Sequence, residues 1–109
     1  MRFGHLELGV GDPRASRAFY VDCLGFTLVA DQGPEFQWVE RGGLEILLRR
    51  GEPSPGISVV FYVDDPAAEA DRLRAGGATV EKQANCWLLR DPDGHLVQVV
   101  NPHDDHAQG

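Results

Sequence analysis

The stretch VGDPRA at residues 10–15 returns in altered form as VDDPAA at residues 63–68, a shift of 53 positions. In both copies a run rich in apolar residues ends in Asp-Pro. This is typical of a strand followed by an N-capping aspartate and a proline at the first helical position. The same shift, without a gap, places His5 on Ser58 and Glu45 on Gln98. The sequence therefore predicts one structural unit that occurs twice.

Each copy predicts the same order of elements, read from hydrophobic periodicity and from glycine punctuation. In the first copy we expect a strand at 3–10, a helix at 13–24 and strands at 26–30, 36–40 and 44–49. In the second we expect a strand at 57–63, a helix at 66–75 and strands at 79–82, 86–90 and 95–100. The predicted fold class is α+β, with two βαβββ modules related by a pseudo-twofold axis. Module one spans 3–50, a linker 51–56, module two 57–102 and a solvated tail 103–109.

The phrases that carry these elements resemble the vicinal oxygen chelate superfamily. The first module has LGVGD at 8–12 and LGF at 24–26, and the second has FYVD at 61–64 and DPDGHLVQ at 91–98. The resemblance covers residues 3–102 and implies a glyoxalase/bleomycin-resistance-like fold with a cavity between the modules. Members of this superfamily include glyoxalase I, extradiol dioxygenases, and bleomycin-resistance proteins that only sequester their ligand. The fold alone therefore leaves the function open.

The resemblance also implies a divalent-metal site whose four positions fall on His5, Glu45, Ser58 and Gln98. His5, Glu45 and Gln98 alternate with apolar neighbours, so we expect them to face one shared cavity. Imidazole and carboxylate ligands suit Zn, Ni, Fe or Mn. The amide of Gln98 ligates weakly and the protonated hydroxyl of Ser58 is a poor ligand, short of three firm ligands. One interpretation is a metal-free polar network in which His5 bonds to Glu45; the other is a metal on His5, Glu45 and Gln98.

Aromatic residues supply the remaining candidates for ligand contact. Trp38, Trp87 and Tyr62 could form a stacking wall for a planar ligand, with Ser58 as a polar contact. For the two tryptophans, packing in the core or in a dimer interface is the alternative. If the protein is an enzyme, Glu45 or Glu7 is the candidate group that moves a proton.

Composition narrows the classes of partner. The chain has 109 residues and a formal net charge of −7, which argues against nucleic acid or an anionic membrane as partner. Neither a signal peptide nor a membrane-spanning run is recognised, so we expect a cytoplasmic protein. Cys23 and Cys86 have no partner spacing and are expected to be free thiols. A domain this small has reason to bury more surface, which favours a homodimer.

Taken together, the residues favour a small-molecule binding protein that works without a metal cofactor. The alternative is a metal-dependent lyase, isomerase or dioxygenase that acts on a small substrate with vicinal oxygens. A third possibility is a dimerising subunit that serves a partner protein and has no ligand of its own.

Overall fold

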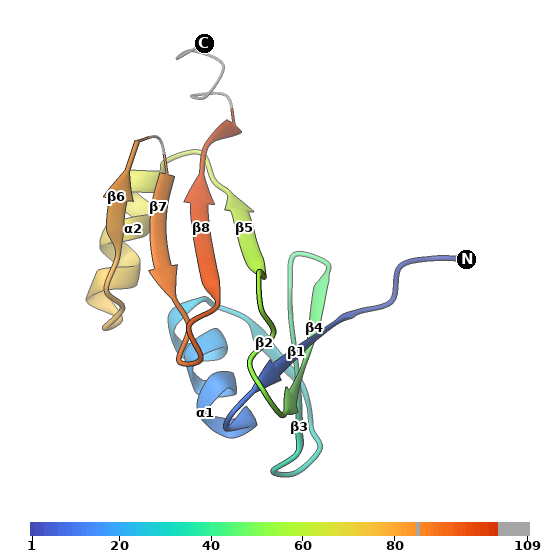
Figure 1. Ribbon diagram of the computed structural model, residues 1–109. Helices are drawn as coiled ribbons and strands as arrows, with labels where there is room; N and C mark the ends of the chain where they lie inside the picture. The colour runs from blue at the N-terminus through green and yellow to red at the C-terminus, as the bar shows by residue number, and fades with distance from the viewer. Residues whose placement is uncertain (85, 103–109) are drawn as a thin grey trace.

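Figure 1 shows the computed structural model, which describes residues 1–84 and 86–102. The first module contains β1 (Leu6–Val10), α1 (Pro13–Ala18), the π-helix η1 (Phe19–Cys23), β2 (Thr27–Asp31), β3 (Phe36–Arg41) and β4 (Leu44–Arg50). The second contains β5 (Ser58–Tyr62), α2 (Pro66–Ala75), β6 (Glu81–Gln83), β7 (Cys86–Arg90) and β8 (Leu96–Val100). The predicted α+β fold with two βαβββ modules is confirmed. The predicted tail at 103–109 lies outside the described residues.

Both modules begin their helix in the way that Asp-Pro predicts. The side chain of Asp12 accepts hydrogen bonds from the amides of Arg14 and Ala15, at 3.1 and 3.3 Å. Asp65 accepts one from the amide of Ala68 at 3.1 Å. These contacts satisfy amides that have no partner within the helix, and the proline that follows each aspartate needs none.

The first helix differs from the predicted α-helix at 13–24. After Ala18 the backbone widens into the π-helical turn η1, and it leaves the helix near Gly25, which has a φ of 75°. Tyr20 in this turn is completely buried and packs edge-on against Phe26, with ring centroids 5.3 Å apart. The wider turn brings Tyr20 into the core, and no periodicity in the sequence signals it.

Each module forms one four-stranded sheet, in the orders β1-β4-β3-β2 and β5-β8-β7-β6. Within each sheet the first and last strands of the module run parallel, and the other neighbours run antiparallel. α1 packs on β3 and β4, whereas α2 packs on β7 and β8. One face of each sheet is thus covered by a helix, and we call the opposite face the open face (Figure 1).

Two strands begin two or more residues later than predicted, whereas the other strand ends lie within one residue of the prediction. β1 begins at Leu6 rather than residue 3, and Phe3 is 74% exposed. β6 covers only residues 81–83 instead of 79–82. Both differences fall at an end strand of a sheet, where few packing contacts fix the first residue.

A single apolar core joins the two modules. It includes Leu8, Ile46 and Leu48 from the first sheet and Val97 and Val99 from the second. The predicted anchor Leu73 is buried in it, and the predicted anchor Phe19 packs against it half-buried. Cys23 and Cys86 are both free and half-buried, as expected. None of the helices in the described part of the chain is long and apolar enough to cross a membrane.

Candidate functional site

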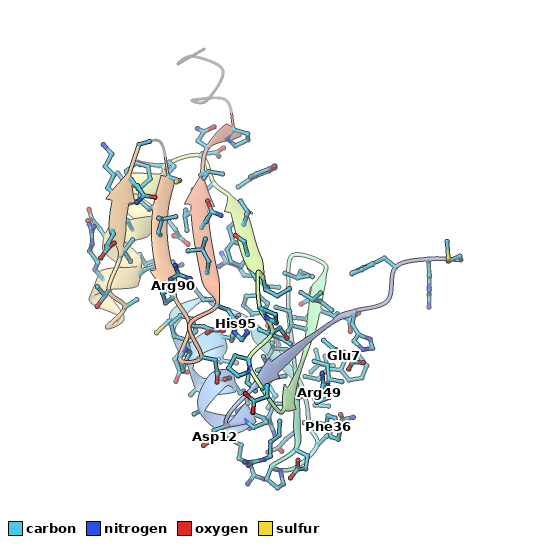
Figure 2. All side chains as sticks on the ribbon, in the orientation of Figure 1. Glu7, Asp12, Phe36, Arg49, Arg90 and His95 are labelled. Atoms are coloured by element: carbon cyan, nitrogen blue, oxygen red, sulfur yellow. The ribbon has the colours of Figure 1, made fainter. Side chains whose placement is uncertain are left out.

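The open face of the first sheet carries an aromatic and charged group. Because Leu8, Val39 and Ile46 are buried, their neighbours along each strand point to the other side. His5 lies there beside Trp38, with ring centroids 5.2 Å apart and planes at 56°. Glu7 accepts from Arg49 Nε at 3.3 Å and lies 3.4 Å from His5 Nε2. Figure 2 shows Glu7 and Arg49 next to each other on this sheet.

The hydrogen-bond partner of His5 among the described residues is therefore Glu7, and the predicted His5–Glu45 bond is not formed. Glu45 is the second residue of β4, one position before Ile46, and Ile46 pairs with Leu6 of β1. Both side chains belong to the same end of the same face. The structure thus brings His5 and Glu45 to adjacent strands, as the alternation predicted, but gives the imidazole a different carboxylate.

One polar atom on this face lacks a partner. The indole Nε1 of Trp38 is buried and has no hydrogen-bond partner among the described residues. An unsatisfied buried N–H costs about 1–3 kcal/mol, so it marks a position where an acceptor from outside the chain would stabilise the protein.

On the open face of the second sheet the charged side chains Glu81 and Arg90 lie on β6 and β7, whereas the part formed by β5 and β8 is uncharged. Gln98 Nε2 donates to Ser58 Oγ at 2.7 Å. Val60 is 47% exposed and Tyr62 73% exposed on the same face. The Ser58–Gln98 pair thus lies beside an exposed apolar side chain and one accessible phenol.

Trp87 does not belong to this face. It pairs with the buried Val99 on β8 and packs against the core, and Lys82 Nζ lies 5.3 Å above its ring. For Trp87 the packing alternative therefore holds, and its prediction as a wall of the ligand site is wrong. The sequence contained the reason: the 53-residue shift does not place Trp38 on Trp87, so the two need not face the same way.

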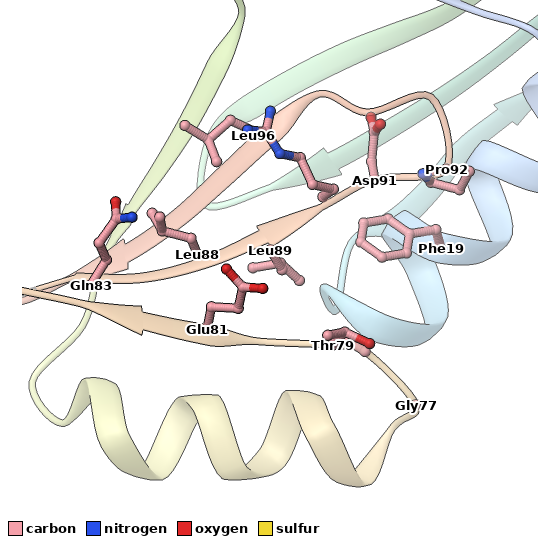
Figure 3. A pocket seen from close by; sticks show the side chains of 12 residues that line it. Phe19, Gly77, Thr79, Glu81, Gln83, Leu88, Leu89, Asp91, Pro92 and Leu96 are labelled. Carbon is pink, nitrogen blue, oxygen red and sulfur yellow. The ribbon is translucent and has the colours of Figure 1, made fainter.

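Three cavities of the described chain lie near these faces. The largest has a volume of about 600 Å³ and runs from Glu81, Leu88 and Leu96 on the second sheet to Phe19 (Figure 3). Ser58 lines a second cavity and Tyr62 a third, whereas His5 and Glu45 line none of these three. The residues predicted to share one cavity thus occupy two separate open faces within one chain.

A cluster that the sequence analysis did not select lies in the turn between β7 and β8. Asp91, Asp93 and His95 place three ligand-type atoms within 4.8 Å of one another, which by distance alone makes a possible metal site. Each group, however, already has partners from this chain. Asp91 Oδ2 lies 2.8 Å from both the Tyr20 hydroxyl and His95 Nδ1. Asp93 accepts from the Gly11 amide at 2.7 Å and from Ser16 Oγ at 3.0 Å.

The chemistry of these atoms fits a hydrogen-bonded turn better than a metal. His95 Nε2 accepts from the Ser54 amide at 3.0 Å, so its lone pair is already used. Burial, with the Asp91 carboxylate next to it, raises the pKa of the Tyr20 phenol far above its usual range, and Tyr20 remains a donor. A metal would have to displace four donors. The predicted set of His5, Glu45 and Gln98 fits a metal no better, because it is divided between two sheets.

Comparison with known proteins places the chain among relatives of the same size. A family model described as the Glyoxalase/Bleomycin resistance protein/Dioxygenase superfamily matches residues 2–99. The lactoylglutathione lyase of Salmonella typhimurium is 26% identical, and the match covers 95% of each chain. A possible glyoxalase from Bacillus cereus superposes with a TM-score of 0.74 at 25% identity, over 92% of this chain and 98% of that one. The bleomycin-binding protein of Streptomyces verticillus, solved with copper(II)-bleomycin, has a TM-score of 0.70 at 25% identity, over 93% and 98%.

Proposed function

Because the chain belongs to the Glyoxalase/Bleomycin resistance protein/Dioxygenase superfamily, we propose that it binds a small molecule between open sheet faces and sequesters it without a metal. The observation that carries this proposal is Trp38. Its ring is half-buried beside His5, and its Nε1 lacks a partner. A planar ligand with a hydrogen-bond acceptor would stack on this ring and satisfy the N–H.

The second sheet supplies the complementary contacts. Tyr62 offers an exposed ring, and the Ser58–Gln98 pair offers a hydroxyl and an amide oxygen. The uncharged, partly apolar surface of β5 and β8, together with the charged first face, suits a ligand with one polar and one apolar side. In this proposal Trp38, Tyr62 and Ser58 contact the ligand, and Trp87 does not.

We further propose that the protein works as a homodimer. Within one chain, the open face that carries His5 and the open face that carries Ser58 are separate. A second copy of the chain is therefore the simplest way to bring one open face of each kind together. Phe36, Val60 and Tyr62 are exposed on these faces and would be buried by such a partner. Sedimentation at micromolar concentration should show a species of twice the 12.0 kDa chain mass; the chain mass alone would contradict the dimer.

A metal-dependent lyase, isomerase or dioxygenase is the second candidate. It is supported by the similarity to a lactoylglutathione lyase over nearly the whole chain. In that case His5 and Glu45 of one protomer and Gln98 of its partner in the proposed dimer would hold a Zn, Ni, Fe or Mn ion that polarises substrate oxygens, and Glu45 or Glu7 would move the proton.

The experiment that separates these functions uses the two tryptophans as a matched pair. We would screen planar aromatic natural products, bleomycin among them, for compounds that raise the Tm of the metal-free protein. Binding should be lost in Trp38→Phe and retained in Trp87→Phe. Compounds that bind Trp38→Phe as well as they bind the wild-type protein would reject the proposed site. Stoichiometric metal in the purified protein, lost in His5→Ala, would favour the enzyme.

A further inference from the structure

We propose that the linker between the modules is held by a hydrogen-bonded clasp, made of Gly9, Ser54, His95, Asp91 and Tyr20. This clasp sets the angle between the two open faces. Its residues are positioning residues for the ligand site, and to that extent the inference rests on the proposed function. The clasp itself is argued from contacts within one chain.

Ser54 is the centre of the clasp because it bonds in two directions. Its Oγ accepts from the amide of Gly9 in β1 at 2.9 Å. Its own amide donates to His95 Nε2, next to the start of β8, at 3.0 Å. A single linker residue is thus fixed to both modules.

The second half of the clasp runs through His95. This side chain is 4% exposed, and Figure 2 shows it at the end of the second sheet, next to the linker. Since Nε2 accepts a hydrogen bond, the ring proton is on Nδ1, which donates to Asp91 Oδ2 at 2.8 Å. Asp91 is also 4% exposed and accepts from the Tyr20 hydroxyl at 2.8 Å. The chain of bonds therefore ends on η1, back in the first module.

Close backbone contact reinforces this arrangement at Gly9. A Cβ atom built on Gly9 would lie 2.1 Å from the carbonyl oxygen of Glu52. Only glycine lets the linker backbone lie against β1 at this distance. The linker is consequently packed, although its composition is that of a flexible connection.

Asp93 adds two further hydrogen bonds between the modules, from the Gly11 amide at 2.7 Å and from Ser16 Oγ at 3.0 Å. The ring contacts between the modules are less directional. Phe26 meets Phe61 edge-on with centroids 5.9 Å apart, and the Arg41 guanidinium lies 5.5 Å from the centre of the Phe61 ring. Apolar and ring contacts of this kind tolerate small rotations, whereas hydrogen bonds weaken steeply with angle. The hydrogen bonds of the clasp, together with those of Asp93, therefore restrict the angle more tightly than the ring contacts do.

The main experiment adds a methyl group between β1 and the linker backbone. Gly9→Ala should force Glu52 away from β1 and open the clasp without removing any polar group. Gly4→Ala is the matched control, because nothing lies within 4 Å of a Cβ at Gly4. In the ligand-free protein we would measure amide hydrogen exchange and residual dipolar couplings. Exchange at Ser54 should rise about tenfold or more in Gly9→Ala, while Val39 and Val97 in the sheet cores stay unchanged.

The dipolar couplings report the angle itself, which a merely stabilising contact would not change. In the wild type and in Gly4→Ala, couplings from both modules should fit one alignment tensor. In Gly9→Ala the two modules should require separate tensors. A single shared tensor in Gly9→Ala would overturn the proposal.

A second pair of variants keeps the proposal testable if Gly9→Ala does not fold. Ser54→Ala removes the acceptor for the Gly9 amide, and Ser54→Thr retains it. Separate tensors in Ser54→Ala with a shared tensor in Ser54→Thr support the clasp, and equal behaviour of the two rejects it.

Two further outcomes bear on the proposal. Binding of one equivalent of Zn²⁺ or Mn²⁺ by Asp91 and His95 would replace the clasp with a metal site. If no compound binds the wild-type protein while Gly9→Ala requires separate alignment tensors, the proposed function is rejected and the clasp is retained.

Discussion

The two sheets have the same topology but a different register. In the first, Leu6 pairs with Ile46, whereas in the second Val59 pairs with Val97, two positions earlier than the 53-residue repeat requires. A slip of two keeps every side chain on its face but moves it along the strand. Gln98 therefore lies opposite Val60 and reaches back to Ser58, while Glu45 lies level with His5. The repeat thus preserves the faces of the fold and not the geometry of a four-ligand site.

The largest effect should come from the β7–β8 turn, whose buried carboxylate and imidazole have no counterpart in the β3–β4 turn of the first module. Asp91→Ala leaves the Tyr20 hydroxyl, His95 Nδ1 and the amides of Asp93 and His95 without their acceptor. We expect the free energy of unfolding to fall by about 3–5 kcal/mol. Urea unfolding measures it, with Asp71→Ala as control because Asp71 is exposed and its change should stay within about 0.5 kcal/mol. Equal losses in the two variants would refute the role assigned to this turn.

The next effect concerns metal affinity and makes the second sheet more like the first. The wild-type protein should hold well under one equivalent of divalent ion. Ser58→His adds an imidazole to the open face of the second sheet, and Zn²⁺ or Ni²⁺ affinity should rise about tenfold or more, or about 1.4 kcal/mol. Calorimetric titration measures this. An unchanged affinity would show that the two-residue slip already prevents a shared site.

Tyr20→Phe tests the buried hydroxyl group of η1, for which α2 has no equivalent. At neutral pH the lost bond to Asp91 should cost about 1 kcal/mol. Because the pKa of Tyr20 is raised in the folded state, its contribution is complete below about pH 10, the usual phenol value. It is lost as the pH rises further, since only the unfolded chain ionises, at up to about 1.4 kcal/mol per pH unit. Denaturation at pH 8 and pH 11 should show this loss in the wild type and in Tyr62→Phe, but reduced in Tyr20→Phe.

The smallest stability effect is expected at His5. Its hydrogen bond to Glu7 is long and partly exposed, so His5→Ala should cost no more than about 1 kcal/mol. Replacing the buried imidazole of the β7–β8 turn, in His95→Ala, should lower the free energy of unfolding by more than His5→Ala does. Thermal unfolding of the two variants compares them directly, and the reverse order would contradict the assignment of His95 to a structural network.

Asp31 provides a comparison that needs no stability measurement. Hydrogen bonds, first from Gln37 and then from the Gly33 amide, hold the pKa of this exposed carboxyl below its usual range. Its stabilising effect is therefore present above the ordinary carboxyl pKa and is lost as the pH falls through the lowered folded value. Carboxyl NMR titration should show that Asp31 loses its proton at a lower pH in the wild type than in Gln37→Leu, because the largest cause of the lowered pKa is removed.

The fold could be predicted from sequence because its signals are local. Asp12-Pro13 and Asp65-Pro66 start helices through contacts within three residues, and alternation identifies which side chains share a face. The pairing of Ser58 with Gln98 and the neighbourhood of His5 and Glu45 follow from the same alternation.

The rest of the site depends on contacts that no local pattern encodes. The bond between Tyr20 and Asp91 spans 71 positions, and it requires the π-helical turn. The register slip depends on how β5 meets β8, and a shift of two leaves the hydrophobic pattern unchanged. Trp87 could have been assigned by comparing it with Leu89 on the same strand, because both lie on the buried side.

The close contact at Gly9 has a consequence for rebuilding the chain. Proline, glycine and serine at 51–56 make this segment look like the natural place for an inserted domain or for new chain ends. The Glu52 carbonyl against Gly9 makes it a poor one, since added residues would have to leave the surface of β1. The turn at Gly42 and Gly43 is the better choice, because open space surrounds both glycines. A circular permutant opened between Gly42 and Gly43 should fold, whereas one opened at Ser54 should be poorly expressed.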